Sequence, residues 1–321
     1  MENISKRTLG KTNIEITPIG LGVMQFAGGQ GVMRFMYPGL SGEDMNAIIQ
    51  AALDGGINWF DTAEFYGKGR SEQGLARGLE AAGRSDDDVV IATKWWPLGR
   101  TAGSITKTIP DRIRYLAPYT IDLHQVHWSW GFSSIEKEME VMADLVEAGK
   151  IRAVGISNHS AEQMRRAHDA LSKRDLPLAS NQMHYSLLNR NIENNGVLDT
   201  AKELGVTIIC YSPLSSGLLT GKFHKDPELL SRLPVGRRMR FRSAVEKSRP
   251  LIDLLDEIAQ AHDVTIAQVA LNWLVNFHGD TVVAIPGASK PQHASESAGA
   301  MNFSLTEDEM AKIDEASRMI E

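Results

Sequence analysis

One short segment contains both a strand end and the residues best suited to chemistry: Asn58-Trp59-Phe60-Asp61-Thr62-Ala63-Glu64-Phe65-Tyr66-Gly67. Residues 57–60 are apolar and rich in strand formers, and Gly55-Gly56 before them is typical of a turn. Asp61 therefore lies where a buried strand ends, and Tyr66 lies on the loop that follows. Because burying an unpaired carboxylate is costly, Asp61 predicts a site with a counter-charge rather than ordinary core.

The same unit, a short apolar strand followed by an amphipathic helix, recurs along the chain after a predicted β-hairpin at 7–17. Strands are predicted at 18–22, 57–60, 89–93, 121–127, 151–157, 177–182, 206–211 and 281–285. Helices are predicted at 45–53, 72–82, 104–116, 134–148, 194–204, 248–262, 266–277, 291–299 and 307–317. Helix caps are predicted at Ser41/Asp44, Ser133/Glu136, Ser160/Gln163 and Thr265/Gln268. Residues 212–246 lack clear periodicity and are expected to form a long functional loop.

Alternating strands and helices predict a parallel sheet. Eight such units without Gly-x-Gly-x-x-Gly favour an α/β fold of the (β/α)8 TIM-barrel type over a doubly wound sheet; the nearest match to that motif, residues 20–25, fails at Gln25. We expect a single domain, 1–321, with the N-terminal hairpin and extra helices near the C-terminus. Catalytic groups gather at the strand C-termini of such barrels. Six candidates fall there: Asp61, Lys94, His127, Ser157, Gln182 and Tyr211.

The overall composition is typical of a globular protein and argues against several functions. The net charge of -6 makes general nucleic-acid binding unfavourable. The N-terminus lacks an apolar signal region, and no run approaches the length of a membrane span. The only cysteine, Cys210, excludes an intrachain disulfide and suits a reducing compartment. We expect a cytoplasmic protein that binds neither nucleic acid nor membrane; no sequence feature indicates its oligomeric state.

Short motifs follow one another at the predicted strand ends: Asp61-Thr62-Ala63 with Tyr66-Gly67, Thr93-Lys94, Asp122-Leu123 with His127-Trp128, Gly155-Ile156-Ser157-Asn158, Gln182, Tyr211-Ser212-Pro213-Leu214, Gly217-Leu218-Leu219-Thr220-Gly221-Lys222 and Ile285-Pro286-Gly287. Each motif alone is weak, but their order over nearly the whole chain is specific. The chain resembles the aldo-keto reductase superfamily. The resemblance implies a barrel that binds a nicotinamide cofactor without a Rossmann domain and reduces carbonyl groups reversibly.

Four residues match the catalytic tetrad of that superfamily: Asp61, Tyr66, Lys94 and His127. Carbonyl reduction needs a hydride on carbon and a proton on oxygen, and Tyr66 is the implied acid. A free phenol has a pKa of about 10, and a nearby cation such as Lys94 lowers it. Asp61 supplies the counter-charge for Lys94, and His127 is expected to orient the substrate oxygen.

The resemblance also implies a site for the nicotinamide and the pyrophosphate. Ser157, Asn158 and Gln182 correspond to residues that hydrogen-bond the carboxamide, and Tyr211 to the aromatic that stacks on the ring. Further cofactor contacts are expected from Val23, Met24, Asp61, Ser212, Pro213, Leu214, Gly217, Leu219 and Lys222. Residues 212–222 are not a P-loop, because Ser216 replaces the first glycine and Phe223 follows the lysine.

The adenosine end is implied to lie at the segment after the last strand. Its candidate residues are Gly287, Ser289, Lys290, His293, Glu296 and Ser297. Lys290 can pair with a 2′-phosphate beside a helix N-terminus. Many relatives have arginine or glutamine at position 293 and asparagine at 297. NADPH is therefore favoured, and NADH stays open. Four arginines in the predicted loop either close on the phosphates or form a solvated basic loop: Arg237, Arg238, Arg240 and Arg242.

The predicted substrate pocket is apolar and aromatic, as small-molecule sites usually are. Its expected lining is Met24, Trp95, Trp96 and Trp128, with Met33, Phe35, Met36 and Tyr37 of the loop 25–41 nearby. We infer small aldehydes or ketones, including ring-bearing ones. No metal site is expected: His124 and His127 are three residues apart on a strand, so they point to opposite faces, and His124 is expected to be structural.

Two other functions stay open. A non-catalytic redox-sensing subunit, like the potassium-channel β subunits that share the fold, would carry asparagine at position 127, where this chain has His127. A sugar or alcohol dehydrogenase that uses NAD or NADP is also consistent with the sequence, because the chemistry is reversible.

Overall fold

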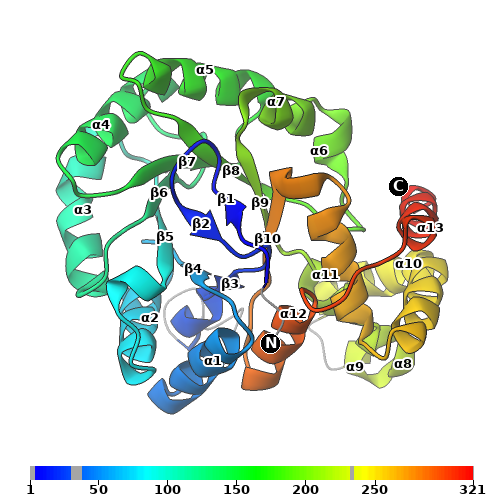
Figure 1. Cartoon of the computed structure of the whole chain (residues 1–321). Helices are drawn as coiled ribbons and strands as arrows, with labels where there is room; N and C mark the ends of the chain where they lie inside the picture. The colour runs from blue at the N-terminus through cyan, green and yellow to red at the C-terminus, as the bar shows by residue number, and fades with distance from the viewer. Residues whose placement is uncertain (1–3, 30–37, 232–234, 321) are drawn as a thin grey trace.

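The computed structural model describes residues 4–29, 38–231 and 235–320. Within these ranges eight parallel strands form the centre of the molecule (Figure 1). They are β3 (Leu21–Gly22), β4 (Trp59–Asp61), β5 (Val90–Trp95), β6 (Leu123–Val126), β7 (Ala153–Ser157), β8 (Leu178–His184), β9 (Thr207–Tyr211) and β10 (Val282–Ile285). Each strand pairs with the next in chain order. Parallel bridges from Ile19 to Ala284 and from Gly22 to Gly287 join the two edges, so the sheet closes into the predicted barrel.

A short hairpin covers the N-terminal end of this barrel. Its strands β1 (Arg7–Thr8) and β2 (Glu15–Ile16) pair antiparallel, which confirms the prediction for residues 7–17. Leu9 and Ile14 pack with Trp59 in the cluster of side chains that fills the barrel. Because the hairpin closes this end, the opposite end, where the strands terminate, is left for a binding site.

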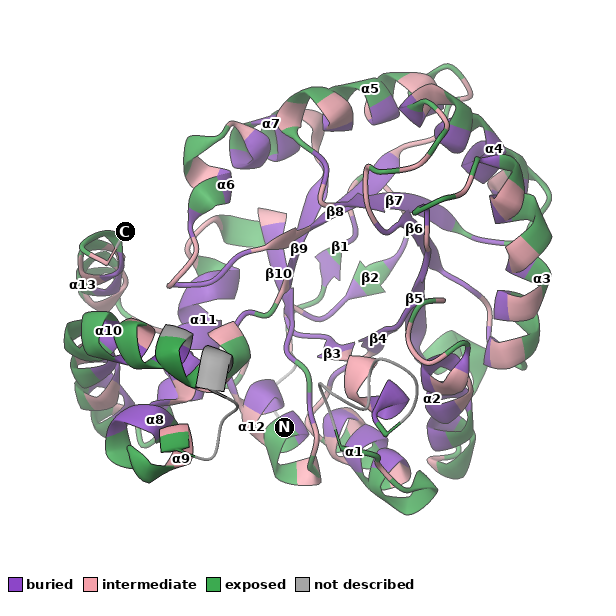
Figure 2. Cartoon of the chain, turned by 180° about the vertical axis from the view of Figure 1, so that it is seen from behind, coloured by how far each residue is buried: buried purple, intermediate pink, exposed green. Residues whose placement is uncertain are grey.

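Helices surround the strands and bury their apolar faces against them, as the purple inner faces in Figure 2 show. The helices of the ring are α1 (Gly42–Asp54), α2 (Arg70–Ala81), α3 (Gly103–Leu116), α4 (Ile135–Glu147), α5 (Ala161–Ser172), α7 (Val197–Leu204), α11 (Ile266–Asn276) and α12 (Pro291–Gly299). Additional helical segments are η1 (Met24–Ala27), η3 (Asp86–Asp88), α6 (Asn191–Asn194), η4 (Ser215–Thr220), α8 (Lys222–Lys225), α9 (Glu228–Ser231), α10 (Val235–Ala261), η5 (Gly279–Thr281) and α13 (Glu307–Arg318).

Most predicted elements agree with these bounds to within a few residues, and three of the four predicted caps form, at Ser41, Ser160 and Thr265. The fourth is wrong by one residue. Ser134 Oγ accepts from Lys137 N at 3.3 Å and caps α4, whereas Ser133 Oγ accepts from Ala102 N at 2.9 Å and fixes the preceding loop. The predicted helix 194–204 corresponds to α7, which begins at Val197, and the short helix α6 precedes it.

The segment 212–246 is not a loop throughout, because α10 begins at Val235 and continues through Pro250. The physical reason is tertiary packing. Phe241 and Val245 lie one turn apart and are buried with Phe223 in a small apolar cluster. This burial stabilises a helical stretch whose arginine-rich sequence shows little periodicity of its own.

Candidate active site

Alternation along the strands assembles a polar layer at the C-terminal end of the barrel. Trp59 and Leu123 belong to the apolar cluster inside the barrel. Asp61 and Gln125 lie two residues further along the same strands and therefore face the same interior. Lys94 pairs in register with Gln125 on the neighbouring strand. The polar layer thus lies directly above the apolar filling.

Asp61 and Lys94 form a buried ion pair in this layer. Lys94 has no exposed surface, and its Nζ donates to Asp61 Oδ1 at 2.5 Å and to Thr62 O at 2.8 Å. The second carboxylate oxygen accepts from Gln182 Nε2 at 2.9 Å and from Gln125 Nε2 at 3.2 Å. Burial lowers the pKa of Lys94, and the Asp61 carboxylate opposes that shift. The carboxylate thereby supplies the counter-charge that a buried ammonium requires.

Tyr66 and His127 lie beside this ion pair. Lys94 Nζ is 5.2 Å from the centroid of the Tyr66 ring. The Tyr66 and His127 rings meet edge to face with their centroids 5.8 Å apart. The structure therefore gathers four chemical groups at one place: a phenol, an ammonium, a carboxylate and an imidazole. They come from three adjacent strand ends, β4 to β6, and from the loop after β4.

His127 is buried, and its imidazole is neutral at neutral pH. Burial, and then the charge of Lys94, lower its pKa well below the ordinary value of 6.5. Its Nδ1 has no hydrogen-bond partner among the residues that the structure describes. The ring of Trp96 packs against it edge to face at 5.3 Å between centroids. A neutral imidazole in this position can donate one N–H to an oxygen atom in the site.

The residues expected at the nicotinamide form a connected patch on β7, β8 and β9. Ser157 Oγ donates to Gln182 O at 3.0 Å, and Asn158 Nδ2 donates to Ser157 Oγ at 2.9 Å. Tyr211 OH donates to Asn158 Oδ1 at 2.9 Å, and its ring stacks on His184 with centroids 5.3 Å apart. Through the bond from Gln182 to Asp61, this patch is continuous with the ion pair.

The segment after β9 has a backbone suited to an anion. Ser215, Ser216 and Gly217 have consecutive left-handed φ values of 48°, 56° and 89°. Turns of this kind gather backbone N–H groups around an anion. The side chain of Lys222, which begins α8, is exposed.

Cationic side chains from a distant segment approach Lys222. Burial lowers the pKa of His293; Glu296 opposes this shift, and the charges of Lys222 and Lys290 add to it, so both lysines lie near His293. Ser289 Oγ is 3.4 Å from His293 Nδ1. The structure thus brings together side chains that are about seventy positions apart in the sequence.

Other predicted cofactor residues differ in exposure. Ser212 and Gly287 are exposed, and Met24 and Leu214 are half-buried. Pro213 is buried, and Ser297 is only 4% exposed. Val23 and Leu219 are fully buried in the apolar core, so the structure does not present their side chains to a ligand.

Two stacked pairs of aromatic rings lie on the loops that carry Tyr66 and His127 or on the adjoining strand end. Trp96 stacks on Phe65 with centroids 4.2 Å apart, and Trp128 stacks on Trp130 at 4.4 Å. Trp95 does not join them, which corrects the prediction for this residue.

Trp95 follows the inward-facing Lys94 on β5, so it points outward. It is fully buried in the core between strands and helices, and its Nε1 donates to Ser104 Oγ at 3.0 Å.

Sequence reasoning missed Gln125 and Phe65, although the two-residue alternation from Leu123 would have placed Gln125 in the barrel. The pKa of the buried His124 is lowered to about 3 by burial and by the charge of Arg112. No group of three or more His, Cys, Asp or Glu suited to a metal ion occurs among the described residues. None of the described helices is long and apolar enough to cross a membrane.

Some predicted positions fall outside the described part of the chain: Met33, Phe35, Met36, Tyr37 and the side chains of Arg237 and Arg240. Arg238 and Arg242 are on α10 rather than on a loop, and both side chains are exposed. Arg242 Nε pairs with Glu246 on the same helix at 3.3 Å. This pair is consistent with the solvated alternative for Arg242.

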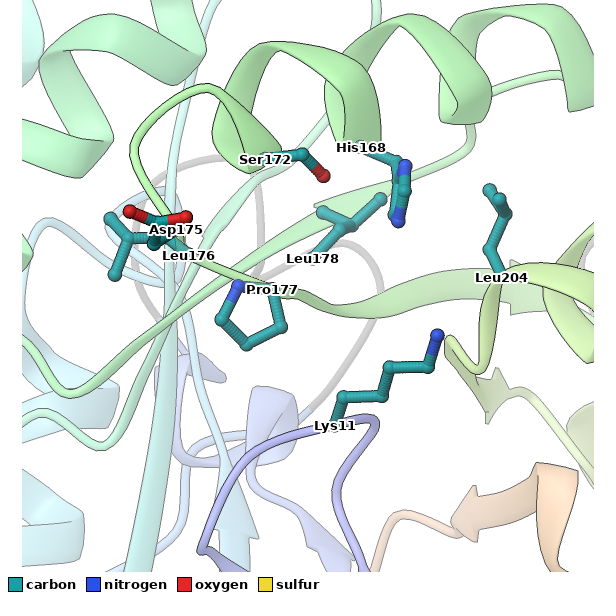
Figure 3. A pocket seen from close by; sticks show the side chains of 8 residues that line it. All are labelled: Lys11, His168, Ser172, Asp175, Leu176, Pro177, Leu178 and Leu204. Carbon is teal, nitrogen blue, oxygen red and sulfur yellow. The ribbon is translucent and has the colours of Figure 1, made fainter.

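A cavity of about 300 Å³ opens at the other end of the barrel (Figure 3). Lys11 of the hairpin, His168 of α5 and Leu178 at the start of β8 contribute to its lining. Because it adjoins the N-terminal ends of the strands, it is separate from the Asp61–Lys94 pair.

Comparison with known proteins identifies the class that this barrel and its polar layer define. The Aldo/keto reductase family model matches residues 18–318. The chain belongs to the aldo/keto reductase family, which confirms the resemblance inferred from its motifs.

Individual relatives cover nearly the whole chain. Pyridoxal reductase, chloroplastic, from Arabidopsis thaliana is 33% identical over 318 residues, covering 95% of this chain and 84% of that protein. Aldo-keto reductase yakc [NADP(+)] from Schizosaccharomyces pombe is 31% identical, with 98% and 92% covered. The solved structure of a glycerol dehydrogenase from Gluconobacter oxydans has a TM-score of 0.80 and 29% identity, with 97% and 94% covered.

Proposed function

We propose that this protein reduces aldehydes or ketones to alcohols with NADPH and that Tyr66 donates the proton. The observation that carries the proposal is the position of Tyr66 beside the buried Asp61–Lys94 pair and His127. Membership of the aldo/keto reductase family supports it. The NADP(+) in the name of the fission-yeast relative supports the choice of cofactor.

The groups at the barrel mouth fit a dinucleotide phosphate. The left-handed turn at 215–217 and the side chains of Lys222 and Lys290 suit phosphate groups. Asn158 and Tyr211 lie at strand ends beside the Asp61–Lys94 pair and suit the nicotinamide. When bound there, NADPH supplies the hydride that the side chains of this protein cannot provide.

The proton is handled by the protein's own residues. Neutral His127 donates an N–H to the carbonyl oxygen and orients it. The Tyr66 O–H gives its proton to the same oxygen as negative charge develops there. Lys94, held in place by Asp61, stabilises the phenolate that remains.

We expect the substrates to be small carbonyl compounds, including ring-bearing ones, because Trp96, stacked on Phe65, packs against His127, and the stacked Trp128 and Trp130 follow His127 in the chain. The likeness to a glycerol dehydrogenase favours a second candidate, oxidation of a polyol by the same site in reverse. Steady-state rates with NADPH and NADH on an aldehyde panel, and with NADP+ and NAD+ on polyols, separate the two.

Replacing Tyr66 by phenylalanine tests the assigned acid. Tyr66→Phe should lower turnover by at least about 10³-fold, because the proton donor is removed while the ring remains. NADPH affinity, measured by fluorescence titration, should stay unchanged. Retained turnover would refute the role of Tyr66, and lost NADPH binding would show that the residue acts on the cofactor instead.

We further propose that residues 1–321 act as one domain in the cytoplasm and bind no nucleic acid. The single buried cysteine Cys210 and the net charge of -6 support this. Cell fractionation tests the location, and limited proteolysis tests whether the chain behaves as one domain.

A further inference from the structure

Glu64 lies between two residues of the candidate active site, Asp61 and Tyr66, but its side chain points away from the polar layer. Its side chain is 12% exposed. The backbone N of Glu64 donates to Lys94 O at 3.1 Å, and its Oε2 accepts from Trp96 N at 3.1 Å. The one residue therefore binds β5 on both sides of Trp95, at the point where the strand ends.

This contact extends the pairing between the loop after β4 and β5 beyond the last strand residue. Trp96 N lies past the end of β5, and the Glu64 side chain provides its acceptor. The ring of Trp96, fixed in this way, stacks on Phe65 and packs edge to face against His127. Glu64 is thus connected to Lys94 through its backbone N–H, and to His127 through its side-chain contact with Trp96.

Two arginines hold the Glu64 carboxylate in place. Arg100 Nη1 donates to Glu64 Oε1 at 2.6 Å, and Arg112 Nη1 lies 3.7 Å from the same oxygen. Arg112 is 4% exposed, and its Nε lies 3.0 Å from Glu72 Oε2. Glu72 in turn accepts from Thr93 Oγ1 at 2.8 Å, next to Lys94 in β5.

The charged groups form a chain behind the catalytic residues. Ordered ion pairs of this kind restrain the groups that carry them, because removing one partner leaves a buried charge uncompensated. Arg100 also ties in the loop after β6, since its carbonyl accepts from Phe132 N at 2.8 Å. Three loops at the barrel mouth are therefore joined at Glu64 and its arginine partners.

We propose that Glu64 is a positioning residue for carbonyl reduction: it sets the loop that carries Tyr66 against Lys94 and the ring of Trp96. The inference rests on the proposed function. Displacing Tyr66 by a fraction of an ångström slows proton transfer, whereas the cofactor contacts on β7 to β9 do not involve Glu64.

The test compares Glu64→Ala and Glu64→Gln with the wild type on one small aldehyde. Glu64→Ala should lower kcat by about 10- to 100-fold, the cost of a misplacement of this size, with the NADPH dissociation constant unchanged. The solvent deuterium isotope effect on kcat should rise, because proton transfer becomes slower. Glu64→Gln keeps an acceptor for Trp96 N and should retain more of kcat than Glu64→Ala.

Glu193→Gln is the matched control. Like Glu64, Glu193 has a largely buried side chain and pairs with an arginine, Arg190, at 2.7 Å, but it contacts none of the catalytic residues. It should lower the melting temperature without changing kcat or the isotope effect. If Glu64→Ala matched the wild type in kcat and isotope effect, or if Glu64→Gln lost as much of kcat as Glu64→Ala, the proposal would be overturned. A wild-type protein without carbonyl reduction would overturn the proposed function and this inference together.

Discussion

The buried charge of Lys94 exists only because of its partners. Burial favours the neutral amine, while Asp61 and the Thr62 carbonyl favour the ammonium. Breaking such a pair typically costs about 3–5 kcal/mol, since one charge is left without compensation. The same two residues therefore stabilise the barrel mouth and keep a cation within reach of Tyr66.

At the same scale, His127 gives a prediction about pH. Burial and the charge of Lys94 lower its pKa well below 6.5 in the folded protein, so we expect the neutral imidazole to be the active form. His127→Gln removes the imidazole donor to the carbonyl oxygen and should lower kcat by about 10²- to 10³-fold.

The factor lost by His127→Gln should be the same at pH 6 and at pH 8, as measured by parallel pH–rate profiles. A loss that grew or vanished between these values would mean that a charged imidazole takes part. Glu193→Gln, which contacts none of the catalytic residues, serves as the comparison and should leave kcat unchanged at both pH values.

At the scale of the element, α4 contains a buried carboxyl without a partner. Glu138 is 2% exposed, and its Oε1 has no hydrogen-bond partner in the part of the chain that the structure describes. Burial raises its pKa from 4.5 to about 8. The folded protein therefore keeps this proton between those values, whereas the unfolded chain loses it. The stability contribution of Glu138 consequently falls as the pH rises through that window.

Glu138→Gln removes this titration. The variant should match the wild type near pH 4.5 and exceed it in stability above pH 8, by on the order of a few kcal/mol. Melting temperatures at the two pH values measure the difference. Glu136→Gln on the same helix should show no gain at high pH, because the exposed Glu136 carboxylate pairs with Arg166 and its pKa is lowered to about 2. Equal behaviour of the two variants would contradict the burial argument.

Elements differ in how well local sequence predicts them. The helix α11 has a Thr265/Gln268 cap and a continuous apolar face, and both features agree with the prediction. The helix α10 has no such local evidence, because Phe241 and Val245 in its first half are buried against partners on η4 and α8. Helices that are stabilised mainly by tertiary contacts are poorly marked in the sequence.

At the scale of the whole molecule, the proposed cofactor phosphate site joins two distant segments. Lys290 is exposed at the start of α12, and both Lys290 and Lys222 of α8 lie near His293. Lys290→Ala should raise the Michaelis constant for NADPH about fivefold, in line with about 1 kcal/mol for an exposed ion pair, and leave that for NADH nearly unchanged.

A substitution at His293 can add a positive charge to the proposed phosphate site instead of removing one. Because burial lowers the pKa of His293, its imidazole carries little charge at pH 7.5. His293→Arg adds a permanent, bidentate donor and should strengthen NADPH over NADH. Lys312→Ala, an exposed lysine on α13 paired with Asp308, is the control and should alter neither constant. Equal shifts for both cofactors would exclude a 2′-phosphate site at Lys290.

The sequence alone determined the alternation of strands and helices, the hairpin and the strand ends at which Asp61, Lys94 and His127 lie, because periodicity and capping are local properties. Only the tertiary structure decided which side chains meet. Three features depend on contacts between segments far apart in the chain. They are the burial of Lys94 against Asp61, the arginine pairs of Glu64 and the packing of Phe241 and Val245 that stabilises the first half of α10. Closure of the barrel creates those contacts, and no local pattern encodes them.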